Sequence, residues 1–119
     1  MSHPQFVQDV LDQLGSTGLR GAICYCGGRN LTYTRPEVKH PLYSEPHDGI
    51  FQFIPNIKKK SVILIAVELS DTYFVGLYVN RELYGESSSG VYCDQLQKIV
   101  EETYDSYLKE EQGGCFYIG

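Results

Sequence analysis

The side chains best suited to recognition chemistry in this sequence are its tyrosines: the chain has ten of them and no tryptophan. Tyr104 and Tyr107 lie three residues apart in a segment with helical periodicity, so they share one helix face. If a helix near the N-terminus packs beside that segment, Phe6 approaches the two rings, and Tyr33 on a strand completes an aromatic floor. Such a floor suits a proline-rich peptide, because a polyproline helix is already extended and loses little entropy on binding. The alternative interpretation is that these rings are amphipathic core residues whose hydroxyl groups reach water.

Three consecutive lysines, Lys58, Lys59 and Lys60, lie between two predicted strands. A solubilising turn is the simpler interpretation, and a contact with an acidic partner surface is the functional one. The whole chain carries a formal net charge of −5, which argues against broad electrostatic binding to nucleic acid or to anionic membranes. We therefore expect a protein partner.

The acidic residues do not form a pattern typical of catalysis. Glu101 and Glu102 are adjacent, so on a helix they point about 100° apart and do not form a catalytic pair. The sequence contains no Ser–His–Asp signature, phosphate-binding loop or nucleotide fingerprint. We predict a binding protein rather than an enzyme, with no cofactor.

The four cysteines do not match a zinc site, because Cys24 and Cys26 are a single short pair and a four-thiolate site needs two such pairs. In a strand, these two side chains share one face. Cys93 and Cys115 flank the last predicted helix and could form a disulfide, but four reduced thiols in a cytosolic protein are the favoured interpretation. We predict no metal site.

The sequence has neither an apolar run long enough to span a membrane nor a basic segment followed by an apolar core at its start. We therefore predict a cytoplasmic protein. Its 119 residues, of which 42% are hydrophobic, suffice for a single domain with a substantial core, residues 1–119.

Two apolar stripes with helical spacing predict helices at residues 6–14 and at about 92–111, the second ending before Gly113 and Gly114. Four prolines between Pro36 and Asn56 exclude a stable middle helix.

Strands are predicted at 19–26, 31–34, 50–54, 61–69 and 72–80, with a short edge strand at 82–85. The first two are expected to pair as a hairpin around GGRN, and the last two long ones as a hairpin around SD. Residues 86–90 are predicted to be a loop, and residues 115–118 a last strand or an ordered tail.

These elements predict an α+β fold: a central antiparallel sheet of five to six strands flanked by N-terminal and C-terminal helices. Because the run at 61–69 is apolar on both faces, both faces of the sheet must be covered. The two helices either lie together on one face or take one face each, and the sequence leaves this choice open.

FVQDVL is similar to the first profilin helix, GGRNLTYT to the glycine turn and second strand, FVGLY to the penultimate strand, and IVEETYDSYLKEEQG to the C-terminal helix. The resemblance implies neighbouring terminal helices, a cytoskeletal role in binding monomeric actin, and proline-rich ligands held by four aromatic residues. By position these are Phe6, Tyr33, Tyr104 and Tyr107.

Two other families offer alternatives. SVILIAVELSDTYFVGLYV resembles a strand pair of the ribosome-inactivating N-glycosidases, which implies that Tyr73 stacks on an adenine and that Glu101 stabilises the cationic sugar. The Arg expected three residues after Glu101 is Tyr104, so this resemblance implies a partial or inactive domain. A small interaction subunit of roadblock or longin type is also compatible with helix-flanked strands, and it implies a homodimer formed through a sheet edge.

Overall fold

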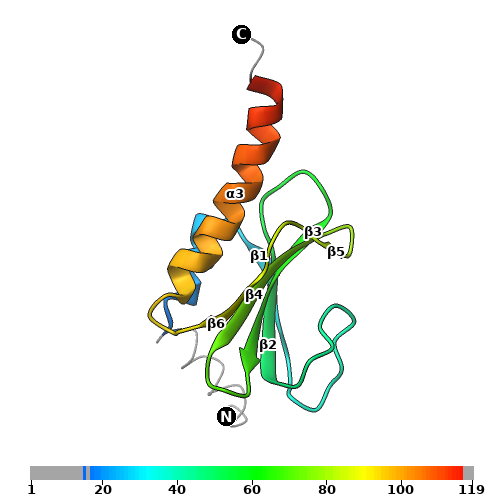
Figure 1. The fold of residues 1–119 in the computed structure, drawn as a ribbon, viewed down its shortest axis with the longest axis vertical. Coiled ribbons are helices and arrows are strands. Elements are labelled where there is room, and N and C mark those ends of the chain that lie inside the picture. Colours follow the sequence, from blue (N-terminus) through cyan, green and yellow to red (C-terminus); the bar gives the residue numbers. More distant parts are fainter. Residues whose placement is uncertain (1–14, 16, 117–119) are drawn as a thin grey trace, which may run out of the picture.

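The structure, a computed structural model, describes residue 15 and residues 17–116, with side chains described up to residue 110. In this part of the chain, six strands form one antiparallel sheet, and two helices pack on one of its faces (Figure 1). The order across the sheet is β1-β2-β3-β4-β5, and β6 also pairs with β4. The predicted α+β fold class is confirmed. In chain order the elements are α2 (Leu19–Tyr25), β1 (Arg29–Thr34), β2 (His47–Ile54), β3 (Ser61–Glu68), β4 (Tyr73–Val79), β5 (Glu82–Leu83), β6 (Ser88–Val91) and α3 (Leu96–Phe116).

The hairpin of β3 and β4 forms the centre of the sheet, because its β-branched and apolar residues can be buried on both faces. Val62 pairs with Tyr78 in this hairpin. The turn is closed by the Glu68 N–H, which donates to the Thr72 carbonyl oxygen at 2.8 Å, and Asp71 adopts a left-handed φ of 64°. The predicted hairpin at 61–69 and 72–80 is confirmed to within one residue at each end.

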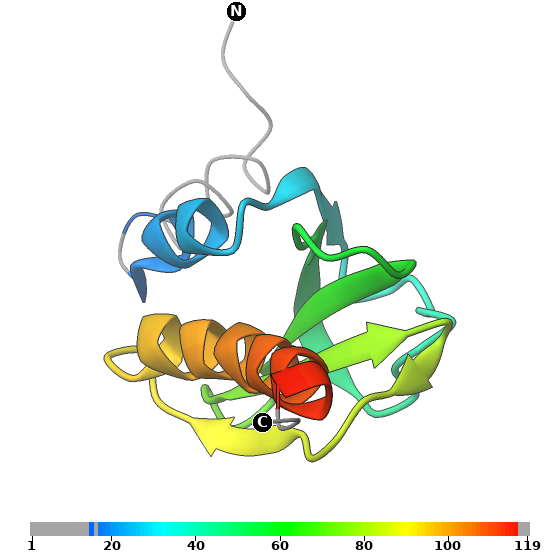
Figure 2. The same ribbon diagram turned by 90° about the horizontal axis from the view of Figure 1, so that it is seen from above.

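Both described helices cover the same face of the sheet. Seen from above, α2 and α3 lie side by side, with the sheet on one side of them (Figure 2). Between helices and sheet lies the larger core cluster, which we call the helix-side core. Its buried members are Leu19, Ala22, Cys26, Phe51, Phe53, Ile63, Ile65, Val67, Tyr73, Val75, Leu77, Val91, Leu96, Val100, Tyr104 and Tyr107.

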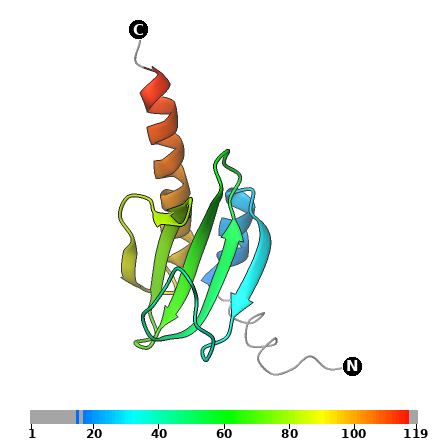
Figure 3. The same ribbon diagram turned by 90° about the vertical axis from the view of Figure 1, so that its right-hand side faces the viewer.

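The opposite face is partly covered by the segment 35–46, which crosses in front of the sheet in Figure 3. This segment contains no helix, as its prolines predict. Its residues Leu42 and Tyr43 pack against a smaller cluster on this face. The buried members of that cluster, which we call the loop-side core, are Ile50, Leu64, Ala66 and Tyr78. This face of the sheet is therefore covered by a loop that two side chains anchor, and not by a helix.

The prediction of a strand at 19–26 is wrong, because most of this segment forms helix α2. Leu19, Ala22 and Cys26 are all buried, and their spacing of three and four residues is that of a helix face. The β-branched and aromatic residues of the segment suggested a strand, but the burial pattern follows the helical period. As a consequence, Cys24 is exposed while Cys26 is buried, and β1 pairs with β2 rather than with this segment.

Several boundaries also differ from the prediction: β1 and β2 begin earlier than predicted, and β5 ends earlier. Part of the loop predicted at 86–90 belongs to β6, which pairs with β4. The Glu68 carboxylate also holds β6, because it accepts hydrogen bonds from Ser89 Oγ at 2.7 Å and from the Gly90 N–H at 2.9 Å. Helix α3 continues through Gly113 and Gly114 to Phe116, so residues 115 and 116 are helical. Glycine lowers helix propensity by about 1 kcal/mol but does not forbid helical φ and ψ. The helix predicted at 6–14 lies outside the described residues.

Candidate functional site

The two predicted ligand-binding tyrosines of α3 are buried. Tyr104 and Tyr107 are 8% and 3% exposed, because α3 packs this face against the sheet. The Tyr104 hydroxyl donates to the Asn56 carbonyl oxygen at 3.0 Å, and its ring meets that of Tyr25 edge-on at 6.3 Å. Tyr107 packs instead against Tyr84, with ring centroids 4.9 Å apart. These rings therefore do not form a floor open to solvent, and ligand binding by them stays a prediction.

The third predicted aromatic residue, Tyr33, lies half-buried on β1. Its ring centroid is 5.2 Å from that of Phe51, and the ring crosses Gly49 so closely that a Cβ there would come within 2.3 Å of the tyrosine oxygen. Glycine is required at this position both for that approach and for its φ of 132°. Tyr33 thus packs onto the helix-side core. Phe6 lies outside the described residues.

The residues implied by the N-glycosidase resemblance do not present an open site. Tyr73 is 6% exposed within the helix-side core, so neither face of its ring is free to stack on a base. Glu101, on α3, accepts a hydrogen bond from Gln97 Nε2 at 3.1 Å. Burial, with Glu101 and Asp105 nearby, raises the pKa of the Cys26 thiol to about 12.

Lys58, Lys59 and Lys60 are exposed in the connection between β2 and β3. Both strands lie inside the sheet, so the lysines project from one end of the sheet rather than from an edge strand. Lys60 also lines a groove on the loop-covered face, and this groove is the strongest candidate for a functional site.

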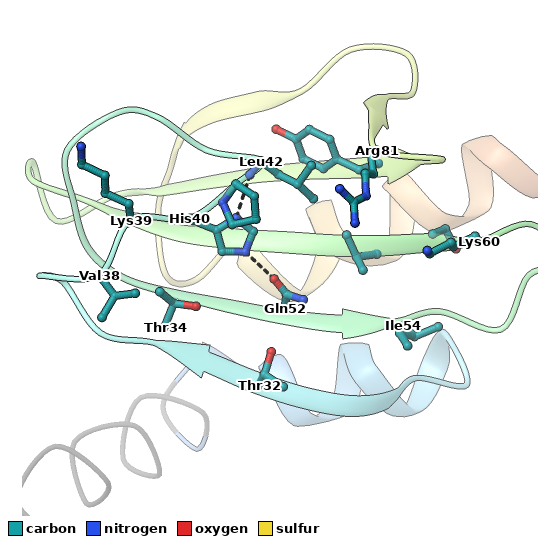
Figure 4. A pocket seen from close by; sticks show the side chains of 14 residues that line it. Thr32, Thr34, Val38, Lys39, His40, Leu42, Gln52, Ile54, Lys60 and Arg81 are labelled. Carbon is teal, nitrogen blue, oxygen red and sulfur yellow. Dashed lines mark hydrogen bonds between the residues drawn. The ribbon is translucent and has the colours of Figure 1, made fainter.

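The groove has a volume of about 580 Å³ and lies between the open face of β1–β4 and the segment 35–46 (Figure 4). Side-chain alternation along β2 builds its floor: Phe51 and Phe53 enter the helix-side core, so Gln52 and Ile54 face the groove. Thr32 pairs with Gln52 in the β1–β2 register and lies beside it. The lining residues are Thr32, Thr34, Val38, Lys39, His40, Pro41, Leu42, Gln52, Ile54, Lys60, Ser61, Val62, Tyr78 and Arg81.

The segment 35–46 stays over the groove because of its anchoring side chains. Leu42 and Tyr43 pack on the loop-side core, and the Tyr43 ring lies 5.0 Å from that of Phe74. Burial raises the pKa of Tyr43 and also that of Tyr78 on the floor of the groove, which favours the neutral hydroxyl at both positions.

A histidine in this segment is held in one tautomer by two hydrogen bonds. His40 Nδ1 accepts the backbone N–H of Leu42 at 3.0 Å, so in the neutral ring the proton lies on Nε2. Nε2 then donates to the side-chain oxygen of Gln52, as the dashed lines in Figure 4 show. The oxygen of Gln52 is occupied by this bond, and its amide nitrogen keeps two N–H donors. The hydrogen bond between His40 and Gln52 therefore joins the 35–46 segment to β2, and the amide N–H groups of Gln52 remain as donors in the groove.

Three cations surround this groove. Lys60 and Arg81 lie at one end, where the Asn80 N–H donates to the Lys60 carbonyl oxygen at 2.9 Å and brings two turns together. Lys39 lies toward the other end (Figure 4). Within the described part of the chain, none of these three side chains pairs with a carboxylate, and no acidic residue lines the groove. The groove is therefore positively charged in a protein whose formal net charge is −5.

Other kinds of site were sought in the same residues. Residue 15 and residues 17–116 contain no group of three His, Cys, Asp or Glu side chains placed to hold a metal ion. No helix of the described part combines the length and apolar character needed to cross a membrane. Cys24, Cys26 and Cys93 are free thiols, and the side chain of Cys115 lies outside those described.

Comparison of the chain with protein-family models, with curated proteins and with solved structures finds no match.

Of the residues named from sequence, only Lys60 lines the groove. His40, Gln52 and Arg81 were missed as a group, because they come from a loop, an inner strand and a tight turn. One signal was present in the sequence: Gln52 interrupts the apolar run IFQFI, which marks a strand position that faces away from the main core.

Proposed function

We propose that this protein is a non-catalytic protein-binding module that holds a segment of its partner in the groove between residues 35–46 and the sheet. The supporting observation is an open groove that combines an apolar floor with hydrogen-bond donors and cations. Its volume of about 580 Å³ lies within the roughly 300–1,000 Å³ typical of ligand sites. Val38, Ile54 and Val62 supply apolar contact, while Gln52 and the cations can orient a bound segment through hydrogen bonds and charge.

The geometry of the groove favours binding over catalysis. Among the described lining residues, His40 carries the imidazole that could act as a general base. Both of its ring nitrogens are already hydrogen-bonded, one to the Leu42 N–H and the other to the Gln52 side chain. A general base needs a nitrogen within hydrogen-bonding reach of the proton that it removes. We further propose a cytoplasmic location, which the free thiols of Cys24, Cys26 and Cys93 support, because unpaired cysteines are typical of reducing compartments.

A peptide selection tests the proposed groove. A phage-displayed library of random linear peptides is selected on the full chain, and enriched peptides are titrated calorimetrically. Thr32→Trp places a large ring on the strand that borders the groove, and we expect it to weaken binding at least about tenfold, or roughly 1.4 kcal/mol. Leu31→Trp makes the same kind of change at an exposed neighbour that does not line the groove, and it should leave affinity unchanged. Equal binding by both variants would remove the groove as the site.

A profilin-like module that binds a proline-rich peptide or monomeric actin between its terminal helices is the second candidate. One observation favours it: Tyr25, 52% exposed at the end of α2, donates to both carboxylate oxygens of Asp105 on α3, at 3.0 and 2.8 Å. This contact leaves an accessible ring where the two helices meet. Titration of tyrosine fluorescence with a polyproline peptide tests the idea. A saturable change that Tyr25→Ala abolishes is expected, and a flat titration rejects it.

A further inference from the structure

We infer that the segment taken up by the groove is acidic: an extended peptide in which Asp or Glu alternates with apolar side chains. This inference deepens the proposed function and rests on it, since it names the chemistry of the partner at the same site. Three independent features carry it: the sign of the charges, the hydrogen-bonding character of the lining, and the apolar floor.

The lining of the groove and helix α3 differ in the charges that they carry. Arg20, Lys98 and Lys109 lie on the helices, and all other Lys and Arg residues lie on β1, on the 35–46 segment or in the β2–β3 and β4–β5 turns. These others are Arg29, Arg35, Lys39, Lys58, Lys59, Lys60 and Arg81. Helix α3 carries the opposite charge through Glu101, Glu102, Asp105 and Glu110. The strands and loops of the sheet also carry acidic residues, namely Glu37, Glu45, Asp48, Glu68, Asp71, Glu82 and Glu86, but none of these lines the groove. A negatively charged ligand is therefore attracted to the groove lining and repelled by α3.

The lining of the groove is rich in donors. The bond from His40 fixes the Gln52 oxygen, so Gln52 offers N–H groups to a ligand. Lys39, Lys60 and Arg81 can only donate, and the hydroxyl groups of threonine can rotate to donate. A carboxylate is an acceptor-only group and matches such a lining, whereas an ammonium or guanidinium group finds no acidic partner there.

The apolar floor and the overall charge distinguish an acidic peptide from other polyanions. Val38, Leu42, Ile54 and Val62 contribute contact surface that a phosphate backbone cannot use. A peptide that alternates acidic and apolar residues can place one set on this floor and the other on the cations at the two ends of the groove. A long nucleic acid is also disfavoured by the net charge of −5 and by the acidic helix layer.

Three capped peptides of identical apolar residues test the inference on the full chain: Glu alternating with Val and Leu, its Gln counterpart and its Lys counterpart. Calorimetry should show the Glu peptide binding at least about tenfold more tightly than the Gln peptide, which corresponds to roughly 1.4 kcal/mol. The affinity for the Glu peptide should also fall as salt is raised, because exposed charges are screened. Resonances of Gln52 and His40 should shift on addition of the Glu peptide.

Charge-removing variants locate the contact. Lys60→Gln and Arg81→Asn should each lower the affinity for the Glu peptide about three- to tenfold, the range expected for one exposed ion pair of roughly 1 kcal/mol. Asn is chosen because residue 81 has a φ of 69°, which asparagine adopts more readily than most residues. Lys109→Gln removes the same charge from exposed α3 and should have no effect.

The outcomes separate the two claims. Equal binding of the Glu, Gln and Lys peptides, lost in Thr32→Trp, would overturn the acidic partner and leave the groove as a binding site. Absence of binding by the Glu peptide would also overturn the acidic partner, and the library selection would then decide the proposed function by itself. Binding that survives both Thr32→Trp and Lys60→Gln would reject this site. Concentration-dependent dimers in light scattering that Lys60→Gln abolishes would identify a second copy of the chain as the occupant instead.

Discussion

The two faces of the central sheet come from the same strands, but they are closed in different ways. The helix-covered face presents Phe51, Phe53, Ile63 and Ile65 to two helices, and this cluster contains most of the buried apolar side chains of the described residues. The loop-covered face has four buried residues in its cluster and is capped by Leu42 and Tyr43. Beyond that cap its surface becomes polar and cationic. A face that docks helices must be apolar along its length, whereas a face capped by a loop can keep polar side chains open for recognition.

The largest expected effect lies on the helix-covered face. Phe53→Ala removes a fully buried ring and should lower the free energy of unfolding by about 3–5 kcal/mol. Denaturant unfolding followed by circular dichroism measures this loss. A loss below about 1 kcal/mol would show that this face is not the main core of the protein.

The corresponding change on the loop-covered face should be smaller and local. Tyr43→Ala removes the half-buried ring that packs on Phe74, and we expect a loss of about 1–2 kcal/mol. Amide exchange should accelerate in residues 35–46 and stay unchanged in α3. Tyr43→Phe keeps the ring and serves as the matched control. If exchange accelerates equally throughout the chain, the two faces are not separable units.

A smaller effect, dependent on pH, is expected at the far end of the loop-covered face. Burial by itself would raise the pKa of Glu68, but hydrogen bonds from Ser89, Gly90 and Thr72 outweigh it and hold the pKa below its ordinary value. A carboxyl group whose pKa is lowered by folding adds stability above its unfolded-state pKa of about 4.3, and this contribution disappears as the pH falls through the folded-state value.

Glu68→Gln should therefore cost about 1–2 kcal/mol at neutral pH, as expected for hydrogen bonds to a charged group. The difference from the natural chain should shrink below about pH 4.3, where Glu68 begins to be protonated in the unfolded state. Parallel denaturant titrations at neutral and acidic pH measure it. A difference that does not depend on pH would contradict the role of the carboxylate charge.

The smallest effect on stability should come from Cys24→Ser on the exposed side of α2, within about 0.5 kcal/mol of the natural chain. Thiol labelling followed by mass spectrometry should nevertheless distinguish Cys24 in α2 from Cys26, which caps the C-terminal end of that helix. Cys24 should react quickly, and Cys26 slowly, because it is buried and its pKa is raised to about 12. Equal labelling rates would favour the strand that the sequence suggested for residues 19–26.

The comparison of the two faces also shows which elements of the fold could be predicted from the sequence. The hairpin of β3 and β4, the strand at 50–54 and the helix that follows residue 95 were predictable, because each has strong periodicity or a long β-branched run. The segment 19–26 was not, since it is short and rich in residues that favour strands, and only its packing selects the helix. β6 was missed because its serines and glycine are typical of a loop, whereas pairing with β4 and hydrogen bonds to Glu68 hold it as a strand.

The candidate site was less predictable than the fold. Sequence alone named Lys60, which lines the candidate groove, as a partner contact, and this role stays a prediction. It also placed a recognition surface at Tyr104 and Tyr107, whose rings are buried. Amphipathic aromatic residues on a helix have the same spacing whether they fill a core or line a groove, so spacing cannot distinguish these roles.

The sequence by itself determined the α+β class, the long strands and the lack of a middle helix, because each depends on local periodicity or on proline geometry. Only the tertiary structure decided that both described helices lie on one face and that residues 35–46 fold over the other. That choice brings His40, Gln52 and Arg81 to one groove. Contacts between residues far apart in the chain depend on how alternate side chains are shared between two layers, and no short stretch of sequence contains that information.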